Sequence, residues 1–464
     1  MRRTADPMRL LSVEPRRVIR PVRPLRRFAA ASWLAALVLV FSALLAFAPA
    51  PARADLQVLI TRGVTNPVPI AVVPFAQVPQ DGGFDVAAVV QHDLTGSGRF
   101  RLMARADMRA MPTTAAQVQA ADWRAAGNDY VVVGRVSSPA NGVLDVDCDL
   151  INTVTGQPVG SQRFVASAAS LRNAAHQVSD FIYQKILGVR GAFATRIAYV
   201  SLIGQPPMQR YQLIVADADG ENPRVILESP RPITSPAWSA DGQWIAYVSF
   251  ENRLSAVYVQ RLSTGERRLV SARAGVNDAP AFSPDGKQLA LTLSGSGGNL
   301  DIWLLDLASQ RLTRLTNDPS IDTEPAWSPD GRSIYFTSDR AGGPQIYKLD
   351  VDNPSRVQRI TFGSSYDAHA AVSPDGKRIA FVTQDGGNYR IAVKDLASGA
   401  VSVLTHGHLD QSPSFAPNGV TIIYSGRDGD VDTLQTVSVD GLVTQRLNSN
   451  QGDVREPAWG PFAH

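Results

Sequence analysis

Hydrophobic and polar positions follow two different patterns along the chain, and the change falls near residue 190. Before it, short runs rich in β-branched residues alternate with segments whose apolar residues have helical spacing. PIAVVPF (69–75) and DYVVVGRV (129–136) are typical of buried strands, and the alternation in 143–166 predicts two more strands around a T-G-Q-P turn. These signals predict a small α/β domain over residues 55–190.

Three segments of this domain have the apolar spacing of helices. They are FDVAAVVQHDL (84–94), AAQVQAADWRAA (115–126) and LRNAAHQVSDFIYQKILG (171–188). The last is amphipathic and ends on Gly188, which we expect to be its C-cap because glycine tolerates the left-handed conformation needed there.

After Arg196 the sequence becomes periodic. Segments such as SPAWSADGQWIAYVSF (235–250) and EPAWSPDGRSIYFTSD (324–339) repeat a short apolar stretch, an S-P-D-G turn and an alternating strand. The large apolar residue of the A-W position recurs every 43 to 45 residues, at Trp238, Phe282, Trp327, Val372, Phe415 and Trp459. A period of this length with short strands and Gly/Asp turns indicates β-propeller blades over 196–464.

The count of strand types predicts how the ring closes. The alternating strand occurs first as RIAYVS (196–201), without an A-W strand before it, whereas the last A-W strand, in EPAWGPF (456–462), has no alternating strand after it. We therefore predict that the C-terminal strand pairs beside RIAYVS. The fold class is thus an α/β N-terminal domain followed by an all-β six-bladed propeller closed by the C-terminal strand.

The first 54 residues differ from the rest in charge and hydropathy. They hold ten of the 45 basic residues, all Arg, and two of the 42 acidic ones, so the remainder has 35 basic and 40 acidic residues. An uncharged run from 28 to 52 leads to Ala52-Arg-Ala54, which predicts a signal peptide (1–54) cleaved before Asp55. An uncleaved anchor is the alternative. We therefore expect an exported, periplasmic protein that does not insert into a membrane after cleavage. Because cleavage removes the excess of basic residues, we also expect that the protein does not bind nucleic acid.

Residues with catalytic or metal-binding chemistry do not form a recognisable motif. No G-x-S-x-G elbow, Walker loop or H-E-x-x-H occurs, so we predict no enzyme, no cofactor and no metal. DADGENPRVILE (217–228) resembles a calcium loop, but Asn222 stands where glycine is required. His406 and His408 lack a clear third ligand. Cys148, the single cysteine, alternates with apolar residues and reads as a core position.

The chain resembles the TolB family of the Tol-Pal envelope system in the order of its parts. These parts are a β-prone start, P-I-A-V-V-P-F, an α/β domain, P-A-W-S-P-D-G blades, GGPQIYKLD (342–350) and a terminal EPAW. The resemblance covers essentially all of the chain after residue 54. It implies a non-enzymatic, monomeric scaffold that binds the inner-membrane protein TolA and the outer-membrane lipoprotein Pal. It also implies roles in outer-membrane integrity, cell division and protein import.

The resemblance also implies where these partners bind. The TolA-binding segment would be 55–66, in particular Asp55, Leu56, Gln57, Val58, Leu59, Ile60, Thr61 and Arg62. Pal would bind the six loops that we expect just before the P-A-W positions. Ala279, Thr323 and Glu324 match the family's motif, and the same loops supply Asp278, Asp367, His369, Asp410 and Arg455. Val276 stands where family members often carry His.

Two other classes of function stay open at this point. One is an exported propeller that binds a carbohydrate or small ligand at the channel mouth. The other is a propeller accessory domain of a peptidase, which the missing nucleophile motif disfavours. Co-purification with an outer-membrane lipoprotein would separate the scaffold from both.

Overall fold

The computed structural model describes residues 59–62, 64–78, 82–295, 297–447 and 453–463. All of them belong to one compact unit, Gln57–His464. The predicted signal peptide and its cleavage site lie outside the described residues. Within the described ranges, no helix is both long and apolar enough to cross a membrane.

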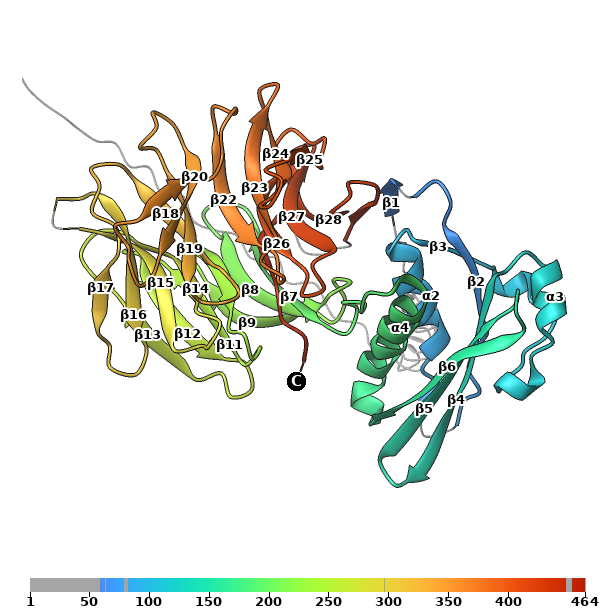
Figure 1. Ribbon diagram of the computed structural model, residues 1–464. Helices are drawn as coiled ribbons and strands as arrows, with labels where there is room; N and C mark the ends of the chain where they lie inside the picture. The colour runs from blue at the N-terminus through green and yellow to red at the C-terminus, as the bar shows by residue number, and fades with distance from the viewer. Residues whose placement is uncertain (1–58, 63, 79–81, 296, 448–452, 464) are drawn as a thin grey trace, which may run out of the picture. The chain divides into compact units, whose positions relative to one another are not determined.

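The α/β domain is built on a five-stranded sheet of order β3-β2-β4-β5-β6 (Figure 1). Strand β2 pairs in parallel with β3 and β4, and the β4-β5-β6 part is antiparallel. The strands are β2 Val68–Val72, β3 Phe100–Leu102, β4 Tyr130–Ala140, β5 Val143–Asn152 and β6 Gln157–Ala166. Cys148 is buried in β5, and this burial raises the pKa of its thiol.

Helices α2 (Val86–Gly96) and α4 (Leu171–Leu187) pack against each other over one face of this sheet (Figure 1). Asp85 caps α2 through the Ala88 N–H, and Gly188 ends α4 at φ 79°, as predicted. Short 3-10 turns complete the domain: η2 Arg105–Asp107, η3 Ala115–Gln117 and η4 Ala168–Ser170.

The prediction of one helix over 115–126 is wrong. The segment consists of η3 and the separate helix α3 (Ala120–Ala125), because Val118 and Gln119 between them are extended. The Ala115 N–H donates to Asp149 on β5, which holds the first turn to the sheet. Trp123 is the buried residue of α3, so little packing favours one continuous helix.

The propeller consists of six antiparallel sheets whose innermost strands are the A-W strands. Blade one is β30-β7-β8-β9, with β7 Arg196–Ile203, β8 Arg210–Asp217, β9 Arg224–Ser229 and β30 Asp453–Trp459. Blade two comprises β10 Ile233–Trp238, β11 Trp244–Ser249, β12 Ala256–Arg261 and β13 Arg267–Ser271. Blade three comprises β14 Asn277–Phe282, β15 Gln288–Ser294, β16 Leu300–Asp306 and β17 Leu312–Arg314.

The other three blades repeat this order. Blade four comprises β18 Asp322–Trp327, β19 Ser333–Ser338, β20 Gln345–Asp350 and β21 Val357–Arg359. Blade five comprises β22 Asp367–Val372, β23 Arg378–Asp385, β24 Asn388–Asp395 and β25 Val401–Val403. Blade six comprises β26 Gln411–Phe415, β27 Thr421–Asp428, β28 Val431–Ser438 and β29 Thr444–Arg446.

The C-terminal strand closes the ring as predicted. In the antiparallel pair of β30 and β7, Ala458 lies opposite Ala198 and Trp459 opposite Ile197. Each A-W strand contacts the next, and β30 contacts both β26 and β10. The Trp238 indole N–H donates to the Ala458 carbonyl at 3.0 Å, so the closing strand is bonded to the next blade as well. Closure protects the edges that an open sheet would expose.

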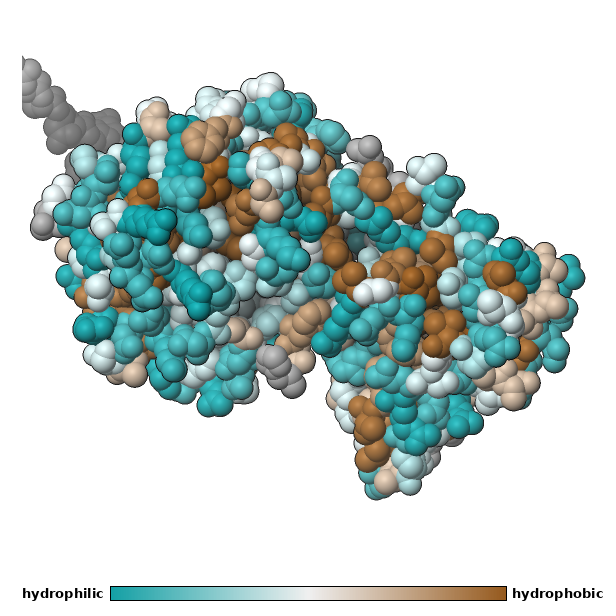
Figure 2. All heavy atoms as spheres, in the orientation of Figure 1, coloured by the Kyte–Doolittle hydropathy of each residue, from teal (hydrophilic) through white to brown (hydrophobic). Residues whose placement is uncertain are grey.

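Nonpolar side chains are concentrated between the blades. Tyr247, Phe336 and Phe381 are fully buried within such inter-blade clusters. On the face displayed in Figure 2, hydrophilic residues cover most of the blades, and hydrophobic ones show mainly between them. The S-P-D-G aspartates have the expected turn role: in three blades the aspartate accepts a hydrogen bond from the motif's own serine, and these residues are Asp285, Asp330 and Asp375.

Candidate binding site at the channel mouth

Each A-W strand has a bulge at the same place, just before the three residues that end in its large apolar residue. The register with the second strand shifts there in all six blades. One residue of each bulge has a left-handed backbone with φ between 47° and 55°, and these six are Ser235, Ala279, Glu324, His369, Ser412 and Glu456. Non-glycine residues rarely adopt this conformation. Because this conformation recurs in all six blades, the bulges change the direction of six side chains in an equivalent way.

The expectation that the candidate Pal residues lie in loops is wrong for most of them. Seven belong to the innermost strands themselves, and only Asp410 precedes its strand. The seven are Asp278, Ala279, Thr323, Glu324, Asp367, His369 and Arg455. The extra residue of each bulge lets the strand continue through a segment whose sequence looks like a turn, because proline and small polar residues are compatible with a bulge.

A cavity of about 400 Å³ lies among these bulges. Four of the predicted residues line it, namely Asp278, Glu324, His369 and Arg455. Ser235, Ser412 and Glu456 line it too, although the sequence analysis did not select them. The cavity therefore brings together side chains from blades that are far apart in sequence.

Glu324 and His369 form the best-defined pair in the cavity. The His369 N–H donates to Glu324 Oε2 at 2.9 Å, the Thr337 hydroxyl donates to the same oxygen at 2.8 Å, and the imidazole Nδ1 lies 3.5 Å from Oε1. Burial alone would raise the pKa of Glu324, but the His369 charge and the hydrogen bonds outweigh it and lower this pKa. Burial opposes charging of the imidazole, yet Glu324 raises the pKa of His369.

Glu456 repeats the role of Glu324 on the closing strand. Its Oε2 accepts the N–H of Ser235, the left-handed residue of the next blade, just as Glu324 accepts that of His369. Burial raises the pKa of Glu456, and it raises that of Asp278, which accepts a hydrogen bond from the Ser235 hydroxyl at 3.1 Å. The shared EPAW motif of Glu324 and Glu456 was the sequence signal that could have identified the second glutamate.

The other predicted Pal residues do not line the cavity. Asp367 and Asp410 are buried and accept hydrogen bonds from the Thr383 hydroxyl (2.6 Å) and the Gly407 N–H (3.2 Å). Burial raises the pKa of both carboxyls. Thr323 shares a hydrogen bond with Thr292 at 3.3 Å, and the Ala279 N–H donates to Asp278. Their contacts position the inner strands.

Arg455, which does line the cavity, reaches Asp432 at 3.1 Å, and this ion pair fixes it at the cavity wall.

Of the predicted TolA segment 55–66, the structure describes residues 59–62 and 64–66, and Leu59–Arg62 form strand β1. Strand β1 pairs antiparallel with β29 and becomes the fifth strand of blade six (Figure 1). Strand β1 therefore joins the propeller and not the sheet of the α/β domain. The outermost strand of a blade offers unpaired backbone groups, which an extended segment can satisfy.

These observations define the class of the protein first. It is a two-domain protein in which a closed six-bladed propeller presents a polar cavity ringed by bulged inner strands, and in which an N-terminal strand is added to one blade. Such a scaffold is typical of binding rather than of a single reactive centre.

Comparison with known proteins then identifies the family. The family model of the TolB beta propeller domain matches residues 183–463, and that of the TolB amino-terminal domain matches 56–159. The chain is 51% identical to the Tol-Pal system protein TolB of Methylococcus capsulatus over 93% of its length and 99% of the relative's. It is 48% identical to that of Thioalkalivibrio sulfidiphilus, over 89% and 95%.

A solved structure points to the same family as these relatives. TolB from Acinetobacter baumannii has a TM-score of 0.81 at 43% identity, covering 87% of this chain and 99% of that one. The chain belongs to the TolB family of Tol-Pal system proteins.

Proposed function

We propose that this chain is a periplasmic, non-enzymatic scaffold of the Tol-Pal system that links TolA of the inner membrane to the outer-membrane lipoprotein Pal. In this role it supports outer-membrane integrity and envelope constriction during cell division. The observation that carries the proposal is the ring of six bulged strands around one polar cavity. A rigid ring whose polar side chains line one cavity is suited to hold a protein partner.

Pal binds at this cavity. Asp278, Glu324, His369 and Arg455 supply the contacts, since their side chains line it. Thr323, Ala279, Asp367 and Asp410 act by holding the inner strands in position. Val276 is exposed at the start of blade three, so the family's histidine contact is replaced there by an apolar surface.

TolA binds the N-terminal segment 55–66. Strand β1 is already extended and pairs through its backbone, which is the form that adds to a partner's sheet edge. Release of β1 from β29 and its capture by TolA would be alternative states of one segment. A ligand shifts such an equilibrium only by its differential affinity for the two states.

Deletion of 55–66 tests the TolA half of the proposal. We expect the truncated protein to lose TolA in a pull-down while it keeps its affinity for Pal, because the cavity residues are untouched. Unchanged TolA capture would reject the assignment of the segment.

Substitution at the cavity tests the Pal half. We expect Glu324→Ala together with Thr323→Ala to weaken Pal binding about tenfold or more, the loss typical of a central interface residue. Asp375→Asn, at an S-P-D-G turn, is the matched control and should bind Pal normally. Envelope crosslinking that recovers no lipoprotein with the unmodified chain would favour the small-ligand alternative instead.

A further inference from the structure

Two arginines of blade one line a second cavity, which has no part in the proposed binding sites. Arg196 begins β7 and Arg224 begins β9, and the cavity that they share has a volume of about 330 Å³. Blade two supplies the rest of the lining from the turns after β10 and β12, namely Gly242, Gln243, Leu262 and Ser263. These turns lie at the strand ends away from the channel mouth. Among the described residues that line the cavity, none is acidic.

Backbone carbonyls of blade two hold both guanidinium groups in place. Arg196 Nη2 donates to the Gly242 carbonyl at 3.0 Å, and the same guanidinium lies 5.1 Å from the centre of the Trp238 ring. Arg224 Nη2 donates to the Leu262 carbonyl at 3.4 Å. A guanidinium has five N–H donors, so each arginine keeps donors for a ligand. Both arginines are exposed, so a ligand can reach them from solvent.

The two positions can be compared in all six blades, because the strand registers are equivalent. In blade two they hold Trp244 and Arg268, and the Arg268 guanidinium lies 4.9 Å from the Trp244 ring centre, so side chains at these positions reach each other. The pairs in the other four blades are Gln288 and Thr313, Ser333 and Gln358, Arg378 and Ser402, and Thr421 and Gln445. Blade one alone therefore places two cations there.

No carboxylate balances these two charges. Within the described ranges, neither Arg196 nor Arg224 forms an ion pair. Partial burial lowers the pKa of Arg196, the charge of Arg224 lowers it further, and Asp217 acts in the opposite direction. Two like charges repel each other, and an anion bound between them removes the repulsion.

Asp217 is engaged by other cations. It lies opposite Arg196 in the pairing of β7 with β8, but its carboxylate accepts a hydrogen bond from the Asn222 side chain at 2.7 Å and lies 3.1 Å from the Arg172 guanidinium. His176 Nε2 lies 3.9 Å from it as well. Asp217 therefore does not serve as the counter-ion of Arg196.

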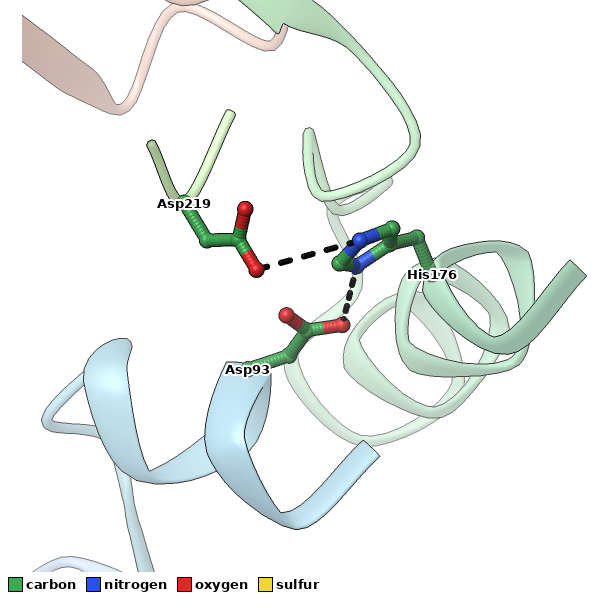
Figure 3. A group of neighbouring side chains, drawn as sticks. All are labelled: Asp93, His176 and Asp219. Atoms are coloured by element: carbon green, nitrogen blue, oxygen red, sulfur yellow. Dashed lines mark hydrogen bonds and ion pairs between the residues drawn. The ribbon is translucent and has the colours of Figure 1, made fainter. Parts of the chain in front are cut away.

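These contacts connect Asp217 to a buried cluster at the contact of the α/β domain with blade one. The cluster consists of Asp93 on α2, His176 on α4 and Asp219 in the loop between β8 and β9 (Figure 3). His176 Nδ1 lies 2.8 Å from Asp93 Oδ2, and Arg172 pairs with Asp219. Burial opposes a charge on the imidazole, but Asp93 and then Asp219 raise the pKa of His176 to about 9. The cluster thus holds its own cations and leaves the arginine pair of blade one uncompensated.

We propose that Arg196 and Arg224 bind a phosphate group, either that of free inorganic phosphate or that of an anionic phospholipid head group. The N–H forks of two guanidiniums match the oxygens of a phosphate and its double negative charge. The Ser263 hydroxyl and the Gln243 side-chain amide line the same cavity and can donate to further oxygens. A volume of about 330 Å³ is within the range of small-ligand pockets, so the cavity also admits the substituent of a phosphate ester.

The test has one arm for each source of the phosphate group. Inorganic phosphate is titrated into the protein by calorimetry at low ionic strength, and the protein is sedimented with vesicles of phosphatidylglycerol or of phosphatidylcholine. We expect one phosphate group per chain and at least about a tenfold loss of affinity in Arg224→Gln, because a hydrogen-bonded charge is removed. Arg224→Lys keeps the charge but lacks the fork, so its loss should be smaller.

The matched control is Arg378→Gln. It removes one positive charge at the position of blade five that is equivalent to Arg196, where the neighbour is Ser402, and it should bind like the unmodified protein. Phosphate binding in solution that Arg224→Gln weakens identifies the free ion as a ligand. Sedimentation with phosphatidylglycerol vesicles alone, lost in the same variant, identifies the lipid.

Three results would overturn the proposal. The first is that neither inorganic phosphate nor phosphatidylglycerol vesicles bind. The second is that Arg224→Gln binds as tightly as the unmodified chain, which leaves an adventitious ion only. The third is an equal loss in Arg378→Gln, because net charge alone would then explain the binding. The thermal midpoint of Arg224→Gln, which we expect to be unchanged for an exposed side chain, shows that the variant is folded.

Discussion

The channel mouth and the buried cluster of Asp93, His176 and Asp219 are both polar, but they differ in how their residues are brought together. At the mouth, Glu324 and Glu456 occupy equivalent places in a repeated strand, and each carboxylate is satisfied by an N–H of the next blade. In the buried cluster, His176 and Asp219 come from unrelated elements, and His176 Nε2 and Asp93 Oδ1 lack a hydrogen-bond partner within the described residues.

The difference shows how each region depends on the rest of the fold. The mouth is formed by six equivalent bulges, so a substitution in one of them leaves the other five in place. The buried cluster exists only where the α/β domain contacts blade one, so one substitution affects all of it. Strand β30 contributes near both regions, because it carries Glu456 to the mouth and Trp459 to the Thr195 hydroxyl at 2.8 Å.

Removal of residues 456–464 should have the largest effect, because it damages both regions. The ring would lose the strand that pairs with β7, together with the buried contacts of Trp459. We expect the thermal midpoint to fall on the order of 10 °C, measured by circular dichroism. A truncated chain that melts like the full-length one would contradict closure by β30.

Arg172→Ala should affect the buried cluster alone. The change leaves Asp217 and Asp219 without their guanidinium, and an uncompensated, largely buried charge typically costs about 3 kcal/mol. Arg163→Ala is the matched control, since Arg163 pairs with Asp147 at an exposed site and its loss should change little. Equal urea midpoints for the two variants would show that the domain contact contributes nothing to stability.

The smallest effect concerns the two EPAW glutamates and depends on pH. The pKa of Glu324 is lowered in the fold, so its charge stabilises at pH values above the ordinary 4.5, and this contribution is lost as the pH falls through the folded pKa. Glu324→Gln should therefore cost about 1 kcal/mol near pH 6 and less near pH 3.

Glu456 should respond with the opposite sign. Its pKa is raised, so its contribution is present below 4.5 and is lost as the pH rises through the folded pKa. Glu456→Gln should gain stability relative to the unmodified chain between pH 4 and pH 7. Urea unfolding at several pH values measures both trends, and parallel curves for the two variants would refute the difference between the glutamates.

Much of the fold could be predicted from local sequence patterns. The 43–45-residue period, the S-P-D-G turns and the unpaired RIAYVS strand predicted six blades and their closure, since each feature reflects a local preference repeated along the chain. The helix ending at Gly188 was predicted for the same reason. The segment 115–126 was not, because its apolar spacing has little to pack against besides the buried Trp123.

The candidate site could be predicted only in part. The resemblance to the family's motif indicated Glu324, and the aligned segments before the A-W positions indicated His369. Comparison of the two EPAW copies would also have indicated Glu456. The sequence could not reveal that Asp367 and Asp410 are buried and bonded to the Thr383 hydroxyl and the Gly407 N–H, because these contacts form only in the folded blades.

By itself the sequence determined the two-domain organisation, the six blades and the closing strand, because these depend on short-range periodicity and turn residues. The tertiary structure alone decided three further features: the left-handed bulges that aim Glu324 into a cavity, the pairing of β1 with blade six, and the meeting of Asp93, His176 and Asp219. Each of these depends on contacts between segments that are distant in the sequence, and no local pattern encodes such contacts.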